Sequence, residues 1–578
     1  MKLKTLATLV AITAIGSPFG AHAQDSTYSP NLPKVSPMDG AIVIDLAQPE
    51  GGQVTDKDMR ATLLSFQGLI NRTESKKIYF KSMPVRVFQT GDERDHMSVE
   101  AGPGDPTQLW IDAGLIPGKL ETPELDNSSS QPVFDYLWAN YSHLIKGKIL
   151  CSDFTKEPEK MGGRAAALTA ATFEDALMVP ISVDSYLTEK GIDLEVLGDT
   201  REMETVEAFN WSIEKYADHP KRNKQVVAFV GDINPPVMWD YWVATHTFSF
   251  WLKKSGPTQQ DAVDPEFAKL LNADYYPQGV PVIGPVEGGK IIQRIQKLGY
   301  TSVCGLLPNA SVTASIPTDP SKFGTAPEPK ALELDPNGVY LSFNGPDGDA
   351  LDFLAYIGFK GMYQDEKVGE APVGWRVNPY FIDLFPTLYG FFSTRDPETI
   401  DIVGSMNDGG SSYTAAGQKG WTEQYRNYLD NSNGSMRLMN FLGGMYSATK
   451  PEILALEFDF VITGYQGETD KFEPEFKITD ETLFSNQVGL RGHAKVSKPG
   501  GPESEDTLKY IRSAIEQESV DGEPFFIMGR LPSECGAHAF SILSWIGEEL
   551  EKDMPKGRKL YFIPPRDLAA TYKSWKKE

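Results

Sequence analysis

The stretch FNGPDGDALDF (residues 343–353) places two carboxylates on a glycine turn directly after an apolar run. The preceding VYLSF (339–343) is apolar enough for a buried strand, and the NGPDG sequence then ends it. In a β/α barrel, side chains just past the carboxyl end of a strand line the mouth in which ligands bind. The stretch therefore predicts a barrel whose first strand delivers Asp347 and Asp349 to that mouth.

From this first strand to the end of the chain, apolar runs alternate with helical segments. The predicted strands are VYLSFN (339–344), VGWRVN (373–378), IDIVGSM (400–406), MRLMNFL (436–442), FVITGYQ (460–466), QVGLRGHAKV (487–496), PFFIMGR (524–530) and KLYFIPP (559–565). Eight strands, within a length close to the roughly 250 residues of a typical barrel, predict an eight-stranded β/α barrel. We assign it to residues 337–578.

The residues before the barrel show a mixed α/β pattern of short units. AIVIDLA (41–47) indicates a strand, residues 58–72 an amphipathic helix and residues 76–80 a second strand. Further predicted strands lie at 147–153, 224–233 and 280–285, and further helices at about 237–254 and 288–300. We predict two or three small α/β domains within residues 24–314. The Pro-, Thr- and Ser-rich segment 315–336 indicates a linker.

The first 23 residues have the pattern of a secretory signal. Lys2 and Lys4 form a basic start, an apolar stretch follows from residue 6 to residue 15, and Ala21-His22-Ala23 matches a cleavage site. The apolar stretch is shorter than the roughly 20 residues that a bilayer span requires. We expect cleavage after Ala23, a secreted or periplasmic protein and no membrane span.

The charge and the cysteines narrow the classes of partner and cofactor. The formal net charge of −24 makes nucleic acid an unfavourable partner, because phosphates would be repelled. Cys151, Cys304 and Cys535 are too widely spaced for a zinc or redox motif. We expect at most one disulfide, favour buried free thiols, and expect no metal and no cofactor.

Polar residues follow several of the predicted barrel strands. Sugar binding requires hydrogen-bonding groups for hydroxyls and a flat aromatic face, and glycosidic cleavage usually requires two carboxyl groups. The candidate catalytic residues are Asp347, Asp349, Asp408 and Glu468, and the candidate substrate-binding residues are Asn344, Trp375, Asn378, Tyr413 and Gln466. This pattern predicts a glycoside hydrolase acting on an oligo- or polysaccharide, with the roles of acid and nucleophile left open.

Each candidate also has a simpler explanation. Aspartates in a Gly/Pro turn often cap a helix or close the turn, and Trp375 could simply fill the barrel. Asp347 and Asp349 could instead bind Ca²⁺ or Mg²⁺, although no glutamate follows at EF-hand spacing. A metal-dependent carbohydrate esterase or deacetylase is a further alternative, but the only histidines after the linker are His493 and His538.

Several segments resemble the glycoside hydrolase family named for a GxGYxYP motif, whose members are largely exported bacterial proteins. The matching segments are QGLINR (67–72), WDYWVATHTFSFWL (239–252), NASV (309–312), DGD (347–349), PVGWRVNPYFIDLFPTL (372–388) and YQG (465–467). The resemblance implies a barrel domain and a glycan ligand.

This chain departs from the family pattern at two places. The naming motif corresponds to GSSYTAA (410–416), which keeps only its first glycine and first tyrosine, and Ala350 replaces the asparagine that usually follows the DGD turn. These changes lead to a second hypothesis, a non-catalytic glycan-binding protein built on a decayed glycosidase scaffold.

Overall fold

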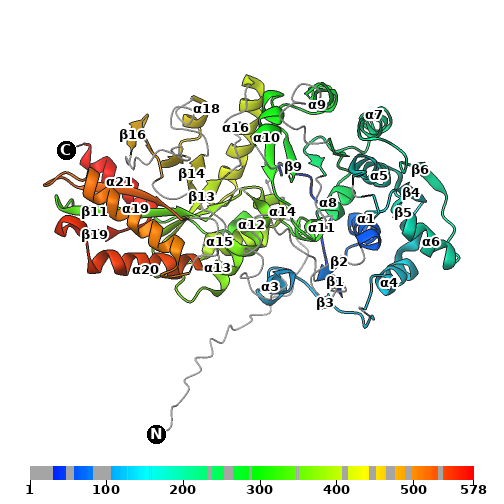
Figure 1. Cartoon of the computed structure of the whole chain (residues 1–578), viewed down its shortest axis with the longest axis horizontal. Coiled ribbons are helices and arrows are strands. Elements are labelled where there is room, and N and C mark those ends of the chain that lie inside the picture. Colours follow the sequence, from blue (N-terminus) through cyan, green and yellow to red (C-terminus); the bar gives the residue numbers. More distant parts are fainter. Residues whose placement is uncertain are drawn as a thin grey trace, which may run out of the picture.

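The protein has an elongated α/β structure with two halves (Figure 1). The elements up to residue 313 form one half and those from residue 338 onward form the other. The computed structural model describes residues 30–46, 57–81, 106–126, 128–154, 156–157, 159–230, 237–252, 264–285, 289–346, 348, 350–405, 414–441, 451–463, 475–487, 498–531 and 538–577.

The amino-terminal half contains three small sheets, and all of their strand pairs are parallel. The sheets are β2–β1–β3 (β1 Ala41–Asp45, β2 Lys77–Lys81, β3 Leu120–Glu121), β5–β4–β6 (β4 Lys148–Cys151, β5 Leu177–Pro180, β6 Val196–Asp199) and β10–β9–β7–β8 (β7 Val227–Phe229, β8 Ser249–Phe250, β9 Pro281–Gly284, β10 Thr301–Cys304). The helices are α1 (Lys57–Thr73), α3 (Pro106–Asp112), α4 (Gln131–Tyr141), α5 (Met161–Glu174), α6 (Ile181–Glu189), α7 (Thr205–Tyr216), α8 (Trp239–Ala244), α9 (Asp264–Leu270), α10 (Gly289–Lys297) and α11 (Ala310–Thr313). The predicted α/β class is confirmed.

One predicted helix in this half is wrong. The helix expected over residues 237–254 ends at Ala244, and Ser249–Phe250 forms strand β8 instead. His246 adopts a left-handed backbone conformation (φ 52°), which turns the chain out of the helix. The thiol of Cys151, at the end of β4, is free and buried, as predicted, and burial raises its pKa.

Three segments of this half that carry the family resemblance meet through buried hydrogen bonds. Gln67 Nε2 donates to Asn309 Oδ1 at 2.9 Å, and Asn71 Nδ2 donates to Ser311 Oγ at 2.7 Å. Ser311 Oγ in turn donates to Asp240 Oδ2 at 2.6 Å. Since these residues come from α1, α8 and the start of α11, the network ties these three helices together.

The carboxyl-terminal half is built on one nine-stranded sheet, in which only the β16–β17 pair is antiparallel. Its strands are β11 (Gly338–Gly345), β12 (Val373–Val377), β13 (Ile400–Ser405), β14 (Met436–Phe441), β15 (Phe460–Thr463), β16 (Phe476–Thr479), β17 (Thr482–Ser485), β18 (Phe525–Arg530) and β19 (Lys559–Phe562). The strand order is β16–β17–β15–β14–β13–β12–β11–β18, and β19 also pairs with β11. Its helices are α12 (Leu351–Phe353), α13 (Phe359–Gln364), α14 (Phe381–Leu384), α15 (Pro386–Thr394), α16 (Ala415–Asp430), α18 (Pro451–Leu454), α19 (Pro502–Glu518), α20 (Ala539–Lys552) and α21 (Pro565–Trp575).

This sheet contains seven of the eight predicted barrel strands, but it differs from a regular eight-stranded barrel. The predicted strand 487–496 lies outside the described residues except for Gln487. The β16–β17 hairpin was not predicted. Among the described strands, β17 and β18 do not pair, so these strands form a curled sheet and not a closed ring.

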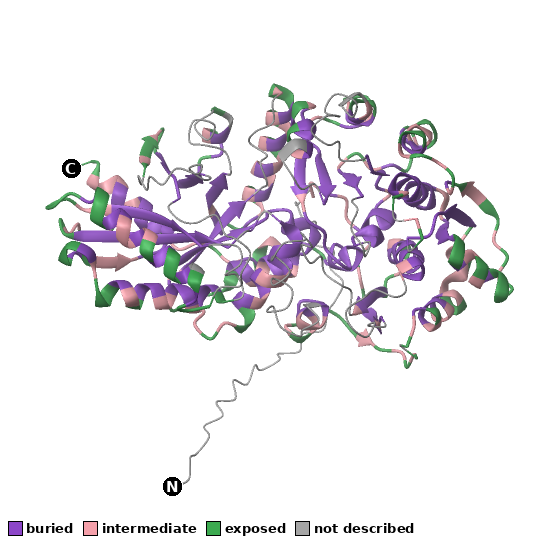
Figure 2. Cartoon of the chain, in the orientation of Figure 1, coloured by how far each residue is buried: buried purple, intermediate pink, exposed green. Residues whose placement is uncertain are grey.

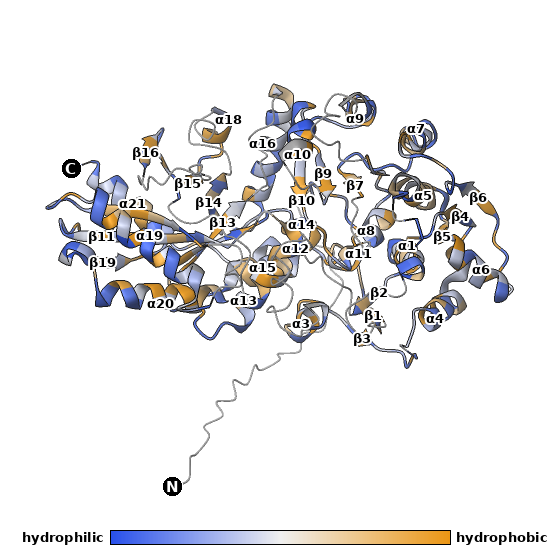
Figure 3. Cartoon of the chain, in the orientation of Figure 1, coloured by the Kyte–Doolittle hydropathy of each residue, from blue (hydrophilic) through white to orange (hydrophobic). Residues whose placement is uncertain are grey.

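The two faces of the curled sheet are covered differently. The outer face packs on helices that are hydrophobic on one side and hydrophilic on the other, such as α20 (Figures 2 and 3). On the other face, Tyr340, Leu438 and Phe526 belong to a separate apolar cluster with Leu568 and Tyr572 of α21. The carboxyl-terminal helix therefore covers the inner face near the amino ends of the strands.

The two halves are joined by specific hydrogen bonds. The backbone N–H groups of Asn31 and Leu32 donate to Asp383 Oδ2 at 3.1 and 3.0 Å. Within the predicted linker 315–336, Thr318 Oγ1 donates to the Ile382 carbonyl at 2.9 Å. None of the described helices has the length and apolar character needed to cross a bilayer.

Candidate functional site

Buried polar side chains line the inner face of the curled sheet at the carboxyl ends of its strands. Side chains alternate between faces along a strand, so Ser342 and Asn344 point to the same side as Tyr340 of the inner apolar cluster. Six of the inner polar residues, called the polar floor below, are Ser342, Asn344, Ser405, Asn440, Ser485 and Gln487, and all six are buried.

An amide cluster at the centre of the polar floor shows how strongly the sheet curls. Asn440 Oδ1 accepts hydrogen bonds from Asn344 Nδ2 at 2.9 Å and from Gln487 Nε2 at 3.0 Å. Asn344 is on β11 and Asn440 is on β14, three positions away in the sheet. In a flat sheet these strands would be about 14 Å apart, at roughly 4.8 Å per strand. Their side chains meet because the sheet folds around them.

Within the described residues, several polar atoms of the polar floor have no hydrogen-bond partner. Asn344 Oδ1, Asn440 Nδ2 and Gln487 Oε1 are buried and have no hydrogen-bond partner within the described part of the chain. The same is true of the hydroxyls of Ser342, Ser405 and Ser485. Buried polar atoms are normally satisfied by protein, water or ligand. A mixture of carbonyl acceptors, amide donors and hydroxyls is suited to the hydroxyl groups of a sugar.

Gly348, at the centre of the DGD sequence, lies against the end of β12. A Cβ on Gly348 would be 2.1 Å from the Arg376 carbonyl oxygen, so only glycine fits at this position. Arg376 Nε also donates to the Pro346 carbonyl oxygen at 2.7 Å. Pro346 and Gly348 are therefore held at the carboxyl edge of the sheet. Asp347 and Asp349, on either side of Gly348, lie outside the described residues.

Of the other candidate residues, the structure describes three. Asn344 belongs to the polar floor. Asn378 is also buried, and its Oδ1 accepts a hydrogen bond from the Tyr380 N–H at 3.0 Å, just before α14. Asp408, Tyr413, Gln466 and Glu468 lie outside the described residues.

Trp375 does not lie where a sugar could stack on it. It is fully buried and stacks on Phe540 of α20, with ring centroids 5.3 Å apart and an interplanar angle of 9°. Its position in β12 places it on the helix-covered face, opposite to the polar floor. The predicted substrate-binding role of Trp375 is replaced by a packing role.

Sequence reasoning missed most of the polar floor. Asn440 sits in MRLMNFL and Ser405 in IDIVGSM, where isolated polar residues interrupt apolar runs. A signal was present. Asn440 lies two residues after Leu438 and Ser405 lies two residues after Val403, and both of these apolar residues face inward. Gln487 could not be found in this way, since it follows a strand that was not predicted.

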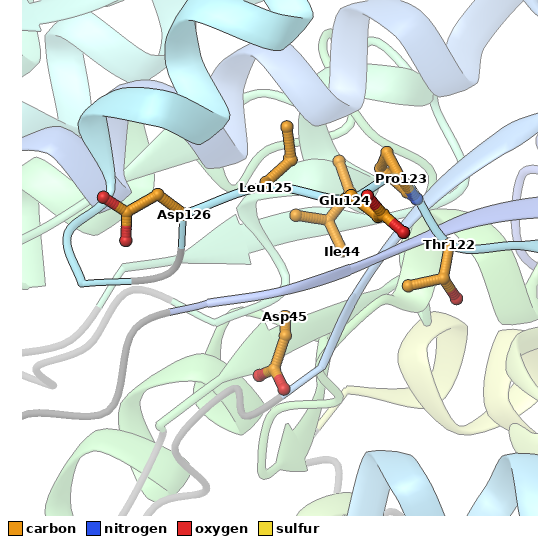
Figure 4. Close-up of a pocket in the computed structure, with 7 residues that line it drawn as sticks. All are labelled: Ile44, Asp45, Thr122, Pro123, Glu124, Leu125 and Asp126. Atoms are coloured by element: carbon orange, nitrogen blue, oxygen red, sulfur yellow. The ribbon is translucent and has the colours of Figure 1, made fainter.

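A separate hollow lies in the amino-terminal half, at the carboxyl end of β1 (Figure 4). Its volume is about 490 Å³, and its lining residues are Ile44, Asp45, Thr122, Pro123, Glu124, Leu125 and Asp126. Lys81 Nζ is 3.8 Å from Asp45 Oδ2. Within the described ranges, no three His, Cys, Asp or Glu side chains converge as a metal site would require.

Replacing Asn440 with leucine should destabilise the carboxyl-terminal half. The change leaves Asn344 Nδ2 buried without its acceptor and removes one of the two acceptors of Gln487 Nε2, which still donates to the Thr463 carbonyl oxygen at 3.0 Å. An orphaned buried donor costs about 1 to 3 kcal/mol, so we expect the free energy of unfolding, measured by urea denaturation, to fall by about that amount. The matched control is Asn140→Leu on the surface of α4, which should change stability by less than about 0.5 kcal/mol. Equal effects of the two changes would contradict a buried amide cluster.

Comparison with known structures identifies a protein with the same fold. The structure described as a putative hydrolase from Bacteroides thetaiotaomicron VPI-5482 matches with a TM-score of 0.70, covering 94% of this chain and 96% of that chain. The two sequences are 16% identical, so the likeness establishes a shared fold and nothing more specific.

More distant matches cover only part of the chain. A putative polysaccharide deacetylase from Mycobacterium smegmatis has a TM-score of 0.30 at 11% identity, over 44% of this chain and 96% of that chain. A probable polysaccharide deacetylase from Pseudomonas aeruginosa PAO1 has a TM-score of 0.26 at 12% identity, over 41% and 91%. No family profile and no curated protein sequence matches this chain.

Proposed function

We propose that this protein is a secreted carbohydrate-active hydrolase that cleaves glycosidic bonds at the carboxyl edge of the curled sheet. The observation that carries the proposal is the polar floor, whose amide and hydroxyl groups gather on the concave face at that edge and include several atoms without a hydrogen-bond partner among the described residues. Sugar recognition depends on such convergent donors and acceptors. Open ends of parallel strands are also where α/β proteins bind ligands.

The sequence supplies carboxylates at the same edge. Asp347 and Asp349 directly follow β11, Asp408 comes three residues after Ser405 at the end of β13, and Glu468 comes five residues after Thr463 at the end of β15. Since these strands are parallel members of one sheet, their carboxyl ends share one edge. This topology supports the pairing of two carboxyl groups that glycoside hydrolysis requires.

The proposal includes the finer expectations from the sequence. These are export after removal of residues 1–23, membership of the GxGYxYP family and completion of the curled sheet into a barrel. The separation of the two working carboxylates would set the stereochemical course, about 5 Å for retention and about 6.5 to 9.5 Å for inversion.

The altered motif at 410–416 and Ala350 favour one alternative, a glycan-binding protein without catalytic activity. A single experiment separates the two functions. Purified protein is incubated with a panel of soluble plant, bacterial and animal polysaccharides, and both reducing-end release and binding by calorimetry are measured. Release of reducing ends from one glycan supports hydrolysis. Binding without release supports the alternative, and neither binding nor release would contradict both.

A further inference from the structure

The chain that follows the DGD turn has an unusual helical geometry. After α12 (Leu351–Phe353) the backbone widens into a π-helical turn over Leu354–Gly358 and then continues as α13. In the π-helical turn the Phe359 N–H donates to the Leu354 carbonyl, five residues back. Such turns are rare, and they occur frequently at functional sites. This one is contacted from another part of the chain.

That contact comes from the amino-terminal half. The indole N–H of Trp110, in α3, donates to the Ala355 carbonyl oxygen at 3.0 Å. The Trp110 ring is fully buried and makes edge contacts with Tyr356 and Phe385, with ring centroids 6.0 and 5.0 Å apart. One side chain from α3 therefore binds the π-helical turn through both a hydrogen bond and ring packing.

A second segment of the amino-terminal half touches the start of α12. Gly305 follows β10 and has a φ of +100°, which favours glycine. A Cβ at this position would lie 2.5 Å from Asp352 Oδ1 and 2.7 Å from the Leu351 backbone N. Leu351 and Asp352 are only two and three residues after Asp349. Gly305 is thus packed directly against Leu351 and Asp352, which follow the DGD sequence in the chain.

We propose that the amino-terminal half holds the segment that follows the DGD turn, residues 350–358, with Trp110 as a positioning residue that acts through the π-helical turn and Gly305 as the close contact beside it. The proposal rests on the proposed function, because this segment follows Asp349 directly in the chain. The proposal gives the amino-terminal half a role in the reaction that the sheet of the carboxyl-terminal half would catalyse. The alternative is that Trp110 serves only to pack the two halves together.

The test uses Trp110→Phe in the full chain, since phenylalanine keeps an aromatic ring but removes the indole N–H. The matched control is Trp242→Phe in α8, because Trp242 is equally buried but its N–H has no partner within the described residues. Hydrogen exchange is followed by mass spectrometry in peptides covering residues 351–362. We expect at least about threefold faster exchange there in Trp110→Phe and no change in Trp242→Phe, because only the first loses a hydrogen bond to this segment.

The second measurement is activity on the polysaccharide that the unmutated protein cleaves in the panel. Misplacing a reacting group by a fraction of an ångström lowers the rate of the chemical step, and 1 Å can cost about 100-fold. We expect kcat to fall about tenfold in Trp110→Phe with KM within about twofold of the unmutated value. Gly305→Ala should act in the same direction through its contact with α12.

The outcomes separate this proposal from the function on which it rests. Unchanged exchange in Trp110→Phe, or an equal loss of kcat in Trp242→Phe, would overturn the positioning role. Faster exchange with unchanged kcat would also overturn it, while the hydrolase function would stand. If the unmutated protein cleaves no polysaccharide of the panel, the hydrolase proposal fails. The hydrogen-exchange result alone then decides whether Trp110 holds the π-helical turn.

Discussion

Replacing Arg566 with methionine is expected to lower the free energy of unfolding by about 3 to 5 kcal/mol at pH 8, because it leaves a charged carboxylate buried without its partner. Arg566, in α21, is 2.5 Å from Asp401 Oδ1 through Nη1, and its backbone N–H donates to Asp401 Oδ2 at 2.9 Å. The side chains of Arg566 and Asp401 are 4% and 0% exposed. This pair anchors the start of the helix that covers the inner face of the sheet.

The size of this loss should depend on pH. Burial raises the pKa of Asp401 to about 6, and Arg566 opposes the rise. A carboxyl pKa of about 3.9 is expected in the unfolded chain. Because the folded pKa is the higher one, the cost of burying Asp401 is absent below pH 4, grows between about pH 4 and 6, and is complete above that range.

Without Arg566 the pKa of Asp401 should rise further, so the carboxyl can accept a proton at mildly acidic pH. The loss of stability in Arg566→Met should therefore be smaller at pH 5 than at pH 8, as measured by urea denaturation at both values. The control is Arg201→Met on the surface, where the pair with Asp199 should contribute no more than about 1 kcal/mol. The double change Asp401→Leu with Arg566→Met should recover much of the stability. A loss below 1 kcal/mol at pH 8 would show that the buried charge is accommodated in another way.

The strands of the large sheet could be predicted from the sequence because most are short apolar runs ended by turn residues. Two strands escaped prediction, the edge strand FKIT (476–479) and its neighbour TLFS (482–485), and the first of them is exposed in its middle residues and carries a lysine. Edge strands that are half-exposed lack the apolar signal that marks buried strands. As a result the sheet was predicted to be more regular than it is.

The candidate site was harder to predict than the fold, and Trp375 shows why. Alternation along a strand specifies which residues share a face, but it does not specify which face becomes concave. Trp375 and Arg376 are neighbours in β12, and either could have faced the site. The direction of curl depends on contacts between distant strands, such as Asn344 with Asn440, and on coverage by α21. No local pattern records these contacts.

Changing Asp349 to asparagine is expected to lower kcat for glycan cleavage by at least about 100-fold, because it removes one of the two carboxyl groups that act on the glycosidic oxygen or the anomeric carbon. Asparagine has nearly the same shape and keeps its hydrogen-bonding oxygen. Glycan affinity, measured by calorimetry, should therefore stay within about threefold of the unmutated value, since binding requires the polar floor more than this charge. The same change at Asp408 and at Glu468, to asparagine and glutamine, should identify the second carboxyl.

The matched control uses the topology of the sheet. Glu398 lies just before β13, at the amino edge, and makes an exposed ion pair with Lys330 at 3.4 Å. Glu398 precedes the amino end of β13, whereas Asp408 follows its carboxyl end. Glu398→Gln therefore removes a carboxylate at the opposite edge of the sheet. It should leave kcat unchanged, because ligands are expected only where the carboxyl ends of parallel strands open. Full activity in Asp349→Asn together with loss in Glu398→Gln would place the chemistry at the other end of the sheet, and the polar floor would then be part of the protein core.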